Sequence, residues 1–435
     1  MTLGSLMKLV VGVVGARFLG AFIGLASQIA FTRFFSPAEV GLILLGMSVT
    51  SLVSLVVSGG YPALAFTKLP QLKALNRLPT LLAVHGAFLR TTIFLWAVVC
   101  LVSALAAATG KLPSGFGPAL FFGCVAALPS SAIRYNSAVA NSNSRFGLSY
   151  LPDFIVRPLL LLLYIVAAKG AGFELSVAHV LWAFVTMILV IALYQMFALG
   201  NTSVGVSNWF DARPRLTRAL TKPAMATLVV AVVATAYADL VTMIGGLLLP
   251  PADVALIGVS IRLAAIAAFV IQATQQFILP GMTAALAARD QARADAMMLR
   301  MNAISLGMMV LGLAATFIVG KLVLAVFGPE YVAAFWLLVL FMVSQAIRAL
   351  GGMNQHLLAL AGKQLYSATA CLTSLTILAA TSVILTRLYG VMGLGMAVVL
   401  AELSWAIHLA SLSRRLTGRR GDLLWLLKPK TTVNN

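Results

Sequence analysis

Long apolar stretches follow one another along almost the whole chain, and this feature limits the fold more than any other. They cover residues 8–32, 38–61, 82–108, 117–140, 147–168, 176–199, 223–249, 253–280, 301–320, 332–354, 364–386 and 390–412, with ends good to a few residues. A bilayer core is about 30 Å thick, so a helix of roughly 20 apolar residues is long enough to span it. Open strands are excluded, because their backbone groups would stay unpaired in lipid. The sequence therefore predicts an all-α polytopic membrane protein with about twelve transmembrane helices.

The net charge of +19 is spread over alternate loops rather than gathered in one patch. Nineteen of the 30 basic residues fall in the two terminal segments and the loops at 62–81, 141–146, 200–222, 281–300 and 355–363. Five fall in the opposite loops, and six arginines fall inside spans. The positive-inside rule then predicts that both termini are cytoplasmic. The basic excess is a topology signal that also favours contact with anionic membrane lipids, and no nucleic-acid partner is expected.

Three segments recur in the second half of the chain in the same order. Ser36–Ile43 parallels Pro250–Ile257 and Ser131–Arg134 parallels Gln345–Arg348, both at a shift of 214 residues, and Phe116–Pro118 more loosely parallels Phe327–Pro329. This pattern predicts duplication of a six-helix unit. Because six is even, the two copies enter the membrane in the same orientation, and folds of this kind bind substrate between the copies.

The duplication also gives the expected domain organisation. We predict an N-terminal six-helix lobe at 1–199, a cytoplasmic linker at 200–222, a C-terminal six-helix lobe at 223–413 related to the first by a pseudo-twofold axis, and a basic cytoplasmic tail at 414–435.

Six arginines and three acids lie well inside the predicted spans. They are Arg17, Arg90, Arg157 and Arg262 near mid-span, Arg134 and Arg348 nearer the cytoplasmic ends, and the acids Asp153, Asp239 and Glu402. A charge at the bilayer centre costs at least roughly 2.5–3.5 kcal/mol, so each needs a partner or a wet cavity. Arginine suits bidentate binding of phosphate or carboxylate and stays charged when buried. The six arginines against three acids predict a cationic cavity and an anionic substrate.

Each of these residues also has a structural alternative. Asp153 and Arg157 stand four apart on one helical face and can pair with each other. Arg134 and Arg348 can reach the inner surface or bind helix-end carbonyls, and the mid-span arginines can pair with acids. Asp239 is either the partner of an arginine or a group that couples transport to H⁺ or Na⁺, and Glu402 and Asp153 are further candidates for these roles. We expect no enzyme activity, cofactor or metal site, because the chain has no catalytic or metal-ligand motif.

Several segments resemble a known family. Gly15–Gly20 followed by Thr32–Gly41 resembles the opening of Wzx-type polysaccharide flippases, which belong to the multidrug/oligosaccharidyl-lipid/polysaccharide (MOP) exporter superfamily. Asp239–Pro280 with Ala284–Met298 resembles the start of their second lobe, and Leu324–Tyr331 through Gly362–Lys363 resembles its later helices. The resemblance implies two six-helix lobes in a MATE-like V shape around a cationic cavity, in the bacterial inner membrane.

The same resemblance implies a function. A protein of this kind moves undecaprenyl-pyrophosphate-linked oligosaccharide from the cytoplasmic to the periplasmic leaflet by alternating access, for O-antigen, capsule or exopolysaccharide synthesis, and works beside polysaccharide polymerase machinery. Related flippases hold pyrophosphate with arginines on the first, third and eighth helices. Arg17, Arg90 and Arg262 occupy those helices here, and Arg157 is a further candidate ligand.

Two other functions remain open at this point. A multidrug or organic-cation antiporter of the same superfamily would need an acid-lined cavity, which the excess of arginine disfavours. A non-transporting scaffold of the polysaccharide assembly complex would leave the mid-span arginines without a polar ligand.

Overall fold

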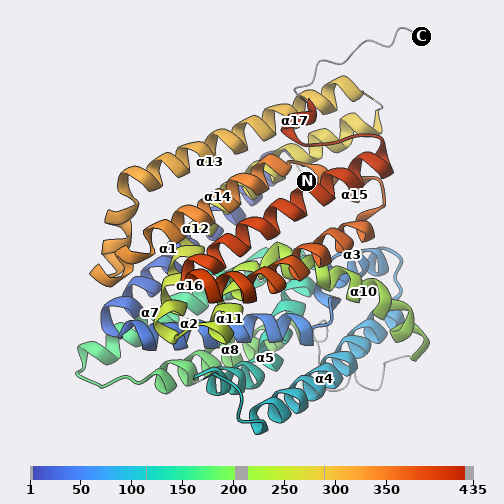
Figure 1. Cartoon of the computed structure of the whole chain (residues 1–435). Helices are drawn as coiled ribbons and strands as arrows, with labels where there is room; N and C mark the ends of the chain where they lie inside the picture. The colour runs from blue at the N-terminus through green and yellow to red at the C-terminus, as the bar shows by residue number, and fades with distance from the viewer. Residues whose placement is uncertain (1–2, 114, 201–213, 289, 427–435) are drawn as a thin grey trace. The chain divides into compact units, whose positions relative to one another are not determined.

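Helices joined by short turns and loops make up the part of the chain that the structure describes (Figure 1). This computed structural model describes residues 3–113, 115–200, 214–288 and 290–426, and none of these residues forms a strand. The chain forms two compact units, Met1–Gly258 and Val259–Asn435. The lobes predicted at 1–199 and 223–413 stay a prediction. Much of the predicted linker and the end of the predicted tail lie outside the described residues.

The first unit is built around α2 (Pro37–Val57). Its other helices are α1 (Leu3–Phe34), α3 (Tyr61–Ala74), α4 (Leu78–Ala108), α5 (Phe116–Ser142), α6 (Phe146–Leu151), the π-helix η1 (Pro152–Val156), α7 (Arg157–Gly170), α8 (Val177–Leu199), α10 (Pro214–Thr235), α11 (Tyr237–Leu248) and the first residues of α12 (Pro251–Ala287). α2 packs against α5, α11, α4 and α8. A helix with so many neighbours is shielded from lipid, so its polar side chains can serve a site inside the unit.

The matching segments Ser36–Ile43 and Pro250–Ile257 both lie at the start of a helix. Ser36 caps α2: its hydroxyl accepts from the Glu39 backbone N–H at 3.4 Å, while the Glu39 carboxylate accepts from the Ser36 N–H at 2.9 Å. α12 likewise begins at a proline, Pro251, with Asp253 in its first turn. Proline fits the first helical position, and an acid in the first turn favours the positive end of the helix dipole.

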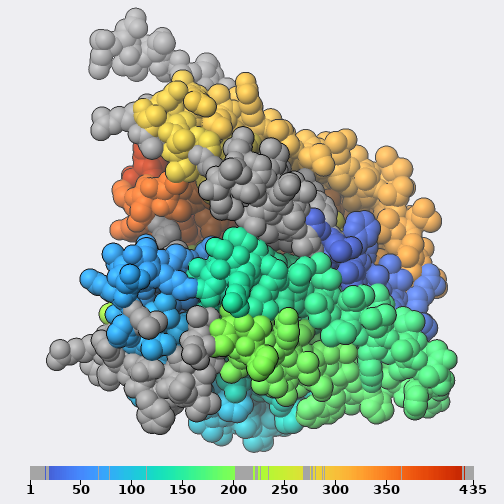
Figure 2. Space-filling model, turned by 180° about the vertical axis from the view of Figure 1, so that it is seen from behind, coloured from blue at the N-terminus to red at the C-terminus, as the bar shows by residue number. Residues whose placement is uncertain are grey.

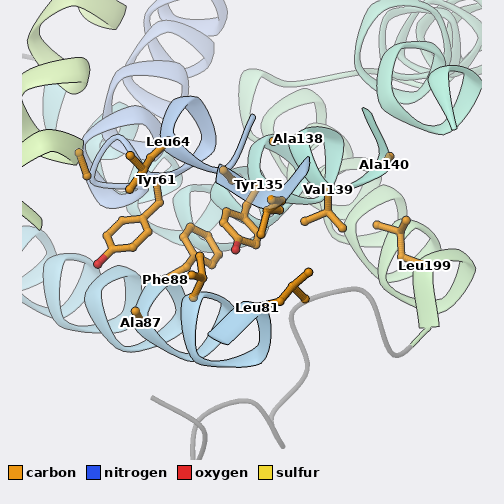
Figure 3. Packing of buried hydrophobic residues seen from close by; sticks show 14 residues of the cluster. Tyr61, Leu64, Leu81, Ala87, Phe88, Tyr135, Ala138, Val139, Ala140 and Leu199 are labelled. Atoms are coloured by element: carbon orange, nitrogen blue, oxygen red, sulfur yellow. The ribbon is translucent and has the colours of Figure 1, made fainter. Parts of the chain in front are cut away.

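A buried aromatic core joins α3, α4 and α5 in the first unit (Figure 3). The rings of Phe88 and Tyr135 stack with centroids 3.9 Å apart, and Tyr61 meets Phe88 edge to face. The Tyr135 hydroxyl lies 2.9 Å from Nδ1 of the buried His85. This core fixes α5 at Tyr135, and therefore fixes the backbone of Arg134 beside it.

Apolar side chains point outward from helices that are long enough to span a membrane. α7 and α8, green in Figure 2, lie side by side and expose Leu163, Val166, Leu193 and Phe197. Within the described residues, eight helices are long and apolar enough to cross a bilayer, or nine if the bent pair Thr227–Val233 and Tyr237–Leu248 forms one span. The chain is a multi-pass membrane protein, and the count of twelve spans stays a prediction.

The second unit contains the rest of α12 and six further elements. They are α13 (Gln291–Phe327), the 3-10 helix η3 (Pro329–Ala334), α14 (Phe335–Gly351), α15 (Asn354–Leu360), α16 (Gln364–Thr417) and α17 (Leu423–Leu426). α14 packs against both α13 and α16 (Figure 1). α16 changes direction at Gly390, where φ is 56°. This kink falls where the sequence separates the stretches 364–386 and 390–412.

The segment after α16 is fastened to the rest of the second unit by Gly421. Its carbonyl accepts from the Met353 N–H at 3.0 Å and from Asn302 Nδ2 at 2.7 Å. Its N–H donates to Asn354 Oδ1 at 2.8 Å. Asn302 and Asn354 are fully buried. These bonds hold the end of the described chain against α13 and α15.

Candidate functional site

Arg134 on α5 is held against α2 by hydroxyl and carbonyl groups. Its Nε donates to Ser54 Oγ at 3.1 Å, and its Nη2 donates to Ser51 Oγ at 3.2 Å and to the Ser51 carbonyl at 3.4 Å. Among the described residues, no carboxylate forms an ion pair with this guanidinium. The side chain is therefore fixed in place without being neutralised by direct contact.

One nitrogen of the Arg134 guanidinium, Nη1, is not used in these hydrogen bonds. Nη1 carries two N–H donors, and it makes no hydrogen bond to a described residue. It is also not one of the buried polar atoms that lack a partner, so it is open to solvent or to a ligand. Arg134 lines a cavity of about 380 Å³ inside the first unit, so a ligand in this cavity can reach the guanidinium.

Three groups of helices surround this cavity. It is lined by Leu55, Ser58, Gly60, Pro62, Ala63 and Phe66 from α2, α3 and their junction, by Arg134, Ser137, Ala138, Ser149, Tyr150, Asp153 and Phe154 from α5, α6 and η1, and by Ala231 and Thr235 from α10. The wall is mostly apolar, with a few polar groups that converge on the same space. This composition is typical of small-ligand sites.

Asp153 lies in η1, where the helix widens to a π-turn. The turn is closed by the Arg157 N–H donating to the Pro152 carbonyl. Asp153 Oδ1 accepts from Arg157 Nη1 at 2.8 Å, and the side chain of Asp153 stays 37% exposed. Arg157 also lies 5.8 Å from the ring centroid of Phe184 on α8. The cavity lining thus contains one basic residue, Arg134, and one acid, Asp153, whose charge is balanced by Arg157 from outside the lining.

α1 holds the π-turn from outside. The Ser27 hydroxyl of α1 donates to the Pro158 carbonyl at 3.0 Å. A Cβ on Gly20 would collide with the Phe154 carbonyl, while a Cβ on Gly24 would meet nothing within 4 Å. Single-turn π-helices occur often at functional sites. Here close packing against Gly20 sets the position of the turn that carries Asp153.

Asp239 lies on α11 and is bonded to α2, one turn before the contacts of Arg134. Its Oδ1 accepts from Ser48 Oγ at 3.0 Å. Ser48, Ser51 and Ser54 are three residues apart, so they share one face of α2. On this face Ser48 binds the Asp239 carboxylate, and Ser51 and Ser54, one turn further along, bind the Arg134 guanidinium. The role of Asp239 as a charge partner or coupling group stays a prediction.

The second unit contains a buried ion pair at the repeat-equivalent position. Arg348 on α14 donates two hydrogen bonds to Glu402 on α16 from one guanidinium edge, Nε to Oε2 at 3.2 Å and Nη2 to Oε1. Glu402 is 1% exposed, and the guanidinium lies 5.3 Å from the ring centroid of Trp405. The two arginines that the sequence match aligns therefore differ: Arg348 is neutralised by a carboxylate, and Arg134 has no carboxylate in contact among the described residues.

The remaining predicted ligands are placed by their helices. Arg90 is half-buried on α4 in the first unit, and Arg262 is half-buried on α12 in the second. Arg17 belongs to α1, but its side chain lies outside the described residues. Their role as a joint pyrophosphate site stays a prediction. Within the described residues, no group of three His, Cys, Asp or Glu side chains is arranged to hold a metal ion.

The serines of α2 were not predicted as site residues. Ser48, Ser51 and Ser54 recur every third residue inside an apolar stretch, and this spacing was the signal that could have identified them. Phe154 and Tyr150 were also missed, because single aromatic residues in a span carry no recognisable pattern.

The fold is that of MOP superfamily transporters. The chain is similar to an inward-facing multidrug resistance MATE family transporter, with a TM-score of 0.64 at 14% identity, covering 94% of each chain. It is also similar to the lipid II flippase MurJ in an inward closed conformation, with a TM-score of 0.71 at 11% identity, covering 92% of this chain and 87% of MurJ. These likenesses establish the fold alone.

A third similar structure is a MOP superfamily transporter from Pyrococcus furiosus, described as having a binding pocket of reverse polarity that suggests a different function. Its TM-score is 0.58 at 14% identity, covering 96% of each chain. No family model and no curated protein sequence matches this chain.

Proposed function

We propose that this protein is a flippase for an anionic lipid-linked oligosaccharide, the undecaprenyl-pyrophosphate-linked repeat unit of a surface polysaccharide. It moves this lipid from the cytoplasmic to the periplasmic leaflet of the bacterial inner membrane by alternating access between two six-helix lobes, with both termini cytoplasmic. One observation carries the proposal: the Arg134 guanidinium at the cavity wall has an unused donor edge and no carboxylate in contact among the described residues.

The charge of the cavity separates this function from export of organic cations. A cation would meet Arg134 at the wall, and the one acid of the lining, Asp153, is already paired with Arg157. An anionic group gains a charge-assisted hydrogen bond from Nη1, about twice as strong as a neutral one. The likeness to the lipid II flippase MurJ supports a lipid-linked cargo on this fold.

The membrane potential favours outward movement of such a cargo. Each charge that crosses 100 mV contributes about 2.3 kcal/mol, so a pyrophosphate with two negative charges gains roughly twice this amount. In the proposed cycle Arg17, Arg90 and Arg262 hold the pyrophosphate, and Asp239 or Glu402 provides the site for a resetting H⁺ or Na⁺. The polysaccharide polymerase receives the product in the outer leaflet.

Complementation tests this function. A bacterial strain that lacks its own flippase would receive the wild-type chain, Arg134→Gln, the triple variant of Arg17, Arg90 and Arg262 to Gln, or Lys111→Gln as an exposed control. We expect surface polysaccharide with the wild type and the control. Both arginine variants should leave lipid-linked intermediate in the cell. Full complementation by these variants at normal expression would contradict the proposal.

A further inference from the structure

We propose that the Arg134 cavity is the subsite for an acidic sugar of the cargo. The guanidinium binds the oxyanion on the sugar ring, and Asp153 accepts hydrogen bonds from the hydroxyls of the same ring. This assignment rests on the proposed function, because it names the part of the cargo that enters this cavity. It distinguishes the sugar from the pyrophosphate of the lipid, which is the other source of negative charge.

The donor side of the subsite is the free edge of Arg134. Ser51 and Ser54 occupy Nε and Nη2, so the guanidinium cannot turn without losing three hydrogen bonds. A side chain held in this way loses little conformational entropy when an oxyanion binds. The two N–H groups of Nη1 provide directional donors to a carboxylate or phosphate group.

The acceptor side of the subsite is Asp153 and the hydroxyls near it. Asp153 uses Oδ1 for Arg157 and remains accessible. The Ser149 hydroxyl gives its proton to the Ser137 carbonyl at 2.8 Å, and the Thr235 hydroxyl gives its proton to the Ala231 carbonyl at 2.7 Å. These oxygens therefore offer lone pairs to the cavity. A ligand must bring several hydrogen-bond donors to satisfy them.

A sugar acid carries both kinds of group, and a bare pyrophosphate carries one. The hydroxyls of a sugar ring donate to carboxylate and hydroxyl oxygens, while its carboxylate or phosphate accepts from Arg134. Pyrophosphate at the same place would bring its negative charge close to the Asp153 carboxylate without donors to offer. Like charges in a partly desolvated site cost free energy, so the acceptors of this cavity disfavour pyrophosphate.

The remaining wall fits the apolar face of a sugar ring. Phe66, Phe154 and Leu55 line the cavity beside the polar groups. The volume of about 380 Å³ is at the small end of the usual range for ligand sites, roughly 300–1,000 Å³. It has room for a small part of an oligosaccharide and not for the whole lipid-linked molecule. The cavity is thus a specificity pocket for one region of the cargo.

A binding experiment on the purified full-length protein tests the assignment. The protein is placed in nanodiscs of uncharged lipid, and saturation-transfer NMR measures binding of methyl glucuronide, methyl glucoside and inorganic pyrophosphate. We expect wild type to bind the glucuronide at least about tenfold more tightly than the glucoside, which corresponds to one charge-assisted hydrogen bond. Arg134→Gln should remove this preference, and Asp153→Asn should weaken the glucoside and strengthen pyrophosphate.

The wild-type protein alone can already overturn the proposal. If glucoside binds as tightly as glucuronide, or if pyrophosphate displaces glucuronide from the Arg134 cavity, the acidic-sugar assignment is wrong. This comparison needs no variant, so a variant that fails to fold does not affect it. Lys111→Gln is the matched control, with binding expected within a factor of two of wild type.

A second arm separates the subsite from the proposed function. Two flippase-deficient hosts are used, one that assembles a repeat unit with a uronic acid and one whose repeat unit is neutral. Wild type should restore polysaccharide better in the acidic host, and Arg134→Gln should lower the ratio between the hosts at least about tenfold. If neither host is restored while glucuronide binding holds, the flippase function fails and the subsite stands. If both hosts are restored equally, the subsite assignment fails and the flippase function stands.

Discussion

The buried pair Arg348–Glu402 makes a quantitative prediction for the stability of the second unit. Glu402 is 1% exposed and Arg348 is 19% exposed, so removing the guanidinium leaves a carboxylate buried without its partner. Breaking a buried ion pair in this way costs about 3–5 kcal/mol. Loss of the contact between Arg348 and the Trp405 ring adds to this cost. We therefore expect Arg348→Met to lower the free energy of unfolding by about 3–5 kcal/mol.

The double variant distinguishes this cause from simple loss of packing. When both partners of a buried pair are replaced by apolar residues, the effect is often neutral or stabilising. Arg348→Met with Glu402→Leu should thus unfold within about 1 kcal/mol of wild type, giving a coupling energy of roughly 3 kcal/mol. Unfolding in mixed micelles titrated with SDS measures each free energy. The exposed Arg387, also on α16, provides the control Arg387→Met, expected within about 0.5 kcal/mol of wild type.

Two results would show that Arg348 and Glu402 do not form a stabilising buried pair. One is a cost below about 1 kcal/mol for Arg348→Met, which would mean that Glu402 reaches water or takes up a proton easily. The other is a double variant that is as unstable as the sum of the two single variants, which would mean that the residues do not act as a pair.

Three further predictions concern single residues. Gly20→Ala should lower the free energy of unfolding by about 1–3 kcal/mol, because the new Cβ collides with the Phe154 carbonyl. Gly24→Ala, with open space around it, should be neutral or slightly stabilising. Equal melting temperatures for the two variants would contradict the packing of α1 on η1. Asn354→Ala should lower the free energy of unfolding by about 1–3 kcal/mol, because it leaves the Gly421 N–H without an acceptor. Unchanged protease resistance of the C-terminal segment would show that this hydrogen bond does not hold the segment in place. Burial lowers the pKa of His356 below its ordinary value near 6.5, so the unfolded state takes up the proton first. The free energy of unfolding should therefore fall as the pH drops below about 6.5. His356→Gln should remove this fall, and the same pH profile in wild type and variant would contradict the prediction.

The class of fold was predictable because the constraint that sets it is local. A span of apolar residues must be a helix in lipid, whatever it packs against. The helix starts at Pro37 and Pro251 were also visible, since a proline followed by an acid is a start signal that needs no tertiary information. The pairing of Asp153 with Arg157 followed from their spacing on one helix for the same reason.

The different roles of Arg134 and Arg348 were not predictable from their equivalent positions. Arg348 meets Glu402 54 residues later in the chain, and Arg134 meets serines about 80 residues earlier. Such contacts depend on how helices pack, and no periodicity within one helix reveals them. The break of the helix at Ala236 and the π-turn at Asp153 were missed as well, because both interrupt a pattern that looks continuous in the sequence.

The most direct test of the central claim is transport by the purified protein itself. Wild type and Arg134→Gln would be reconstituted at equal density in vesicles that carry a fluorescent undecaprenyl-pyrophosphate-linked oligosaccharide with a uronic acid. A reagent that quenches only the outer leaflet would follow the lipid as it crosses. We expect rapid crossing with wild type and crossing at least about tenfold slower with Arg134→Gln, because one charge-assisted contact is lost. Crossing with wild type no faster than in protein-free vesicles would contradict it.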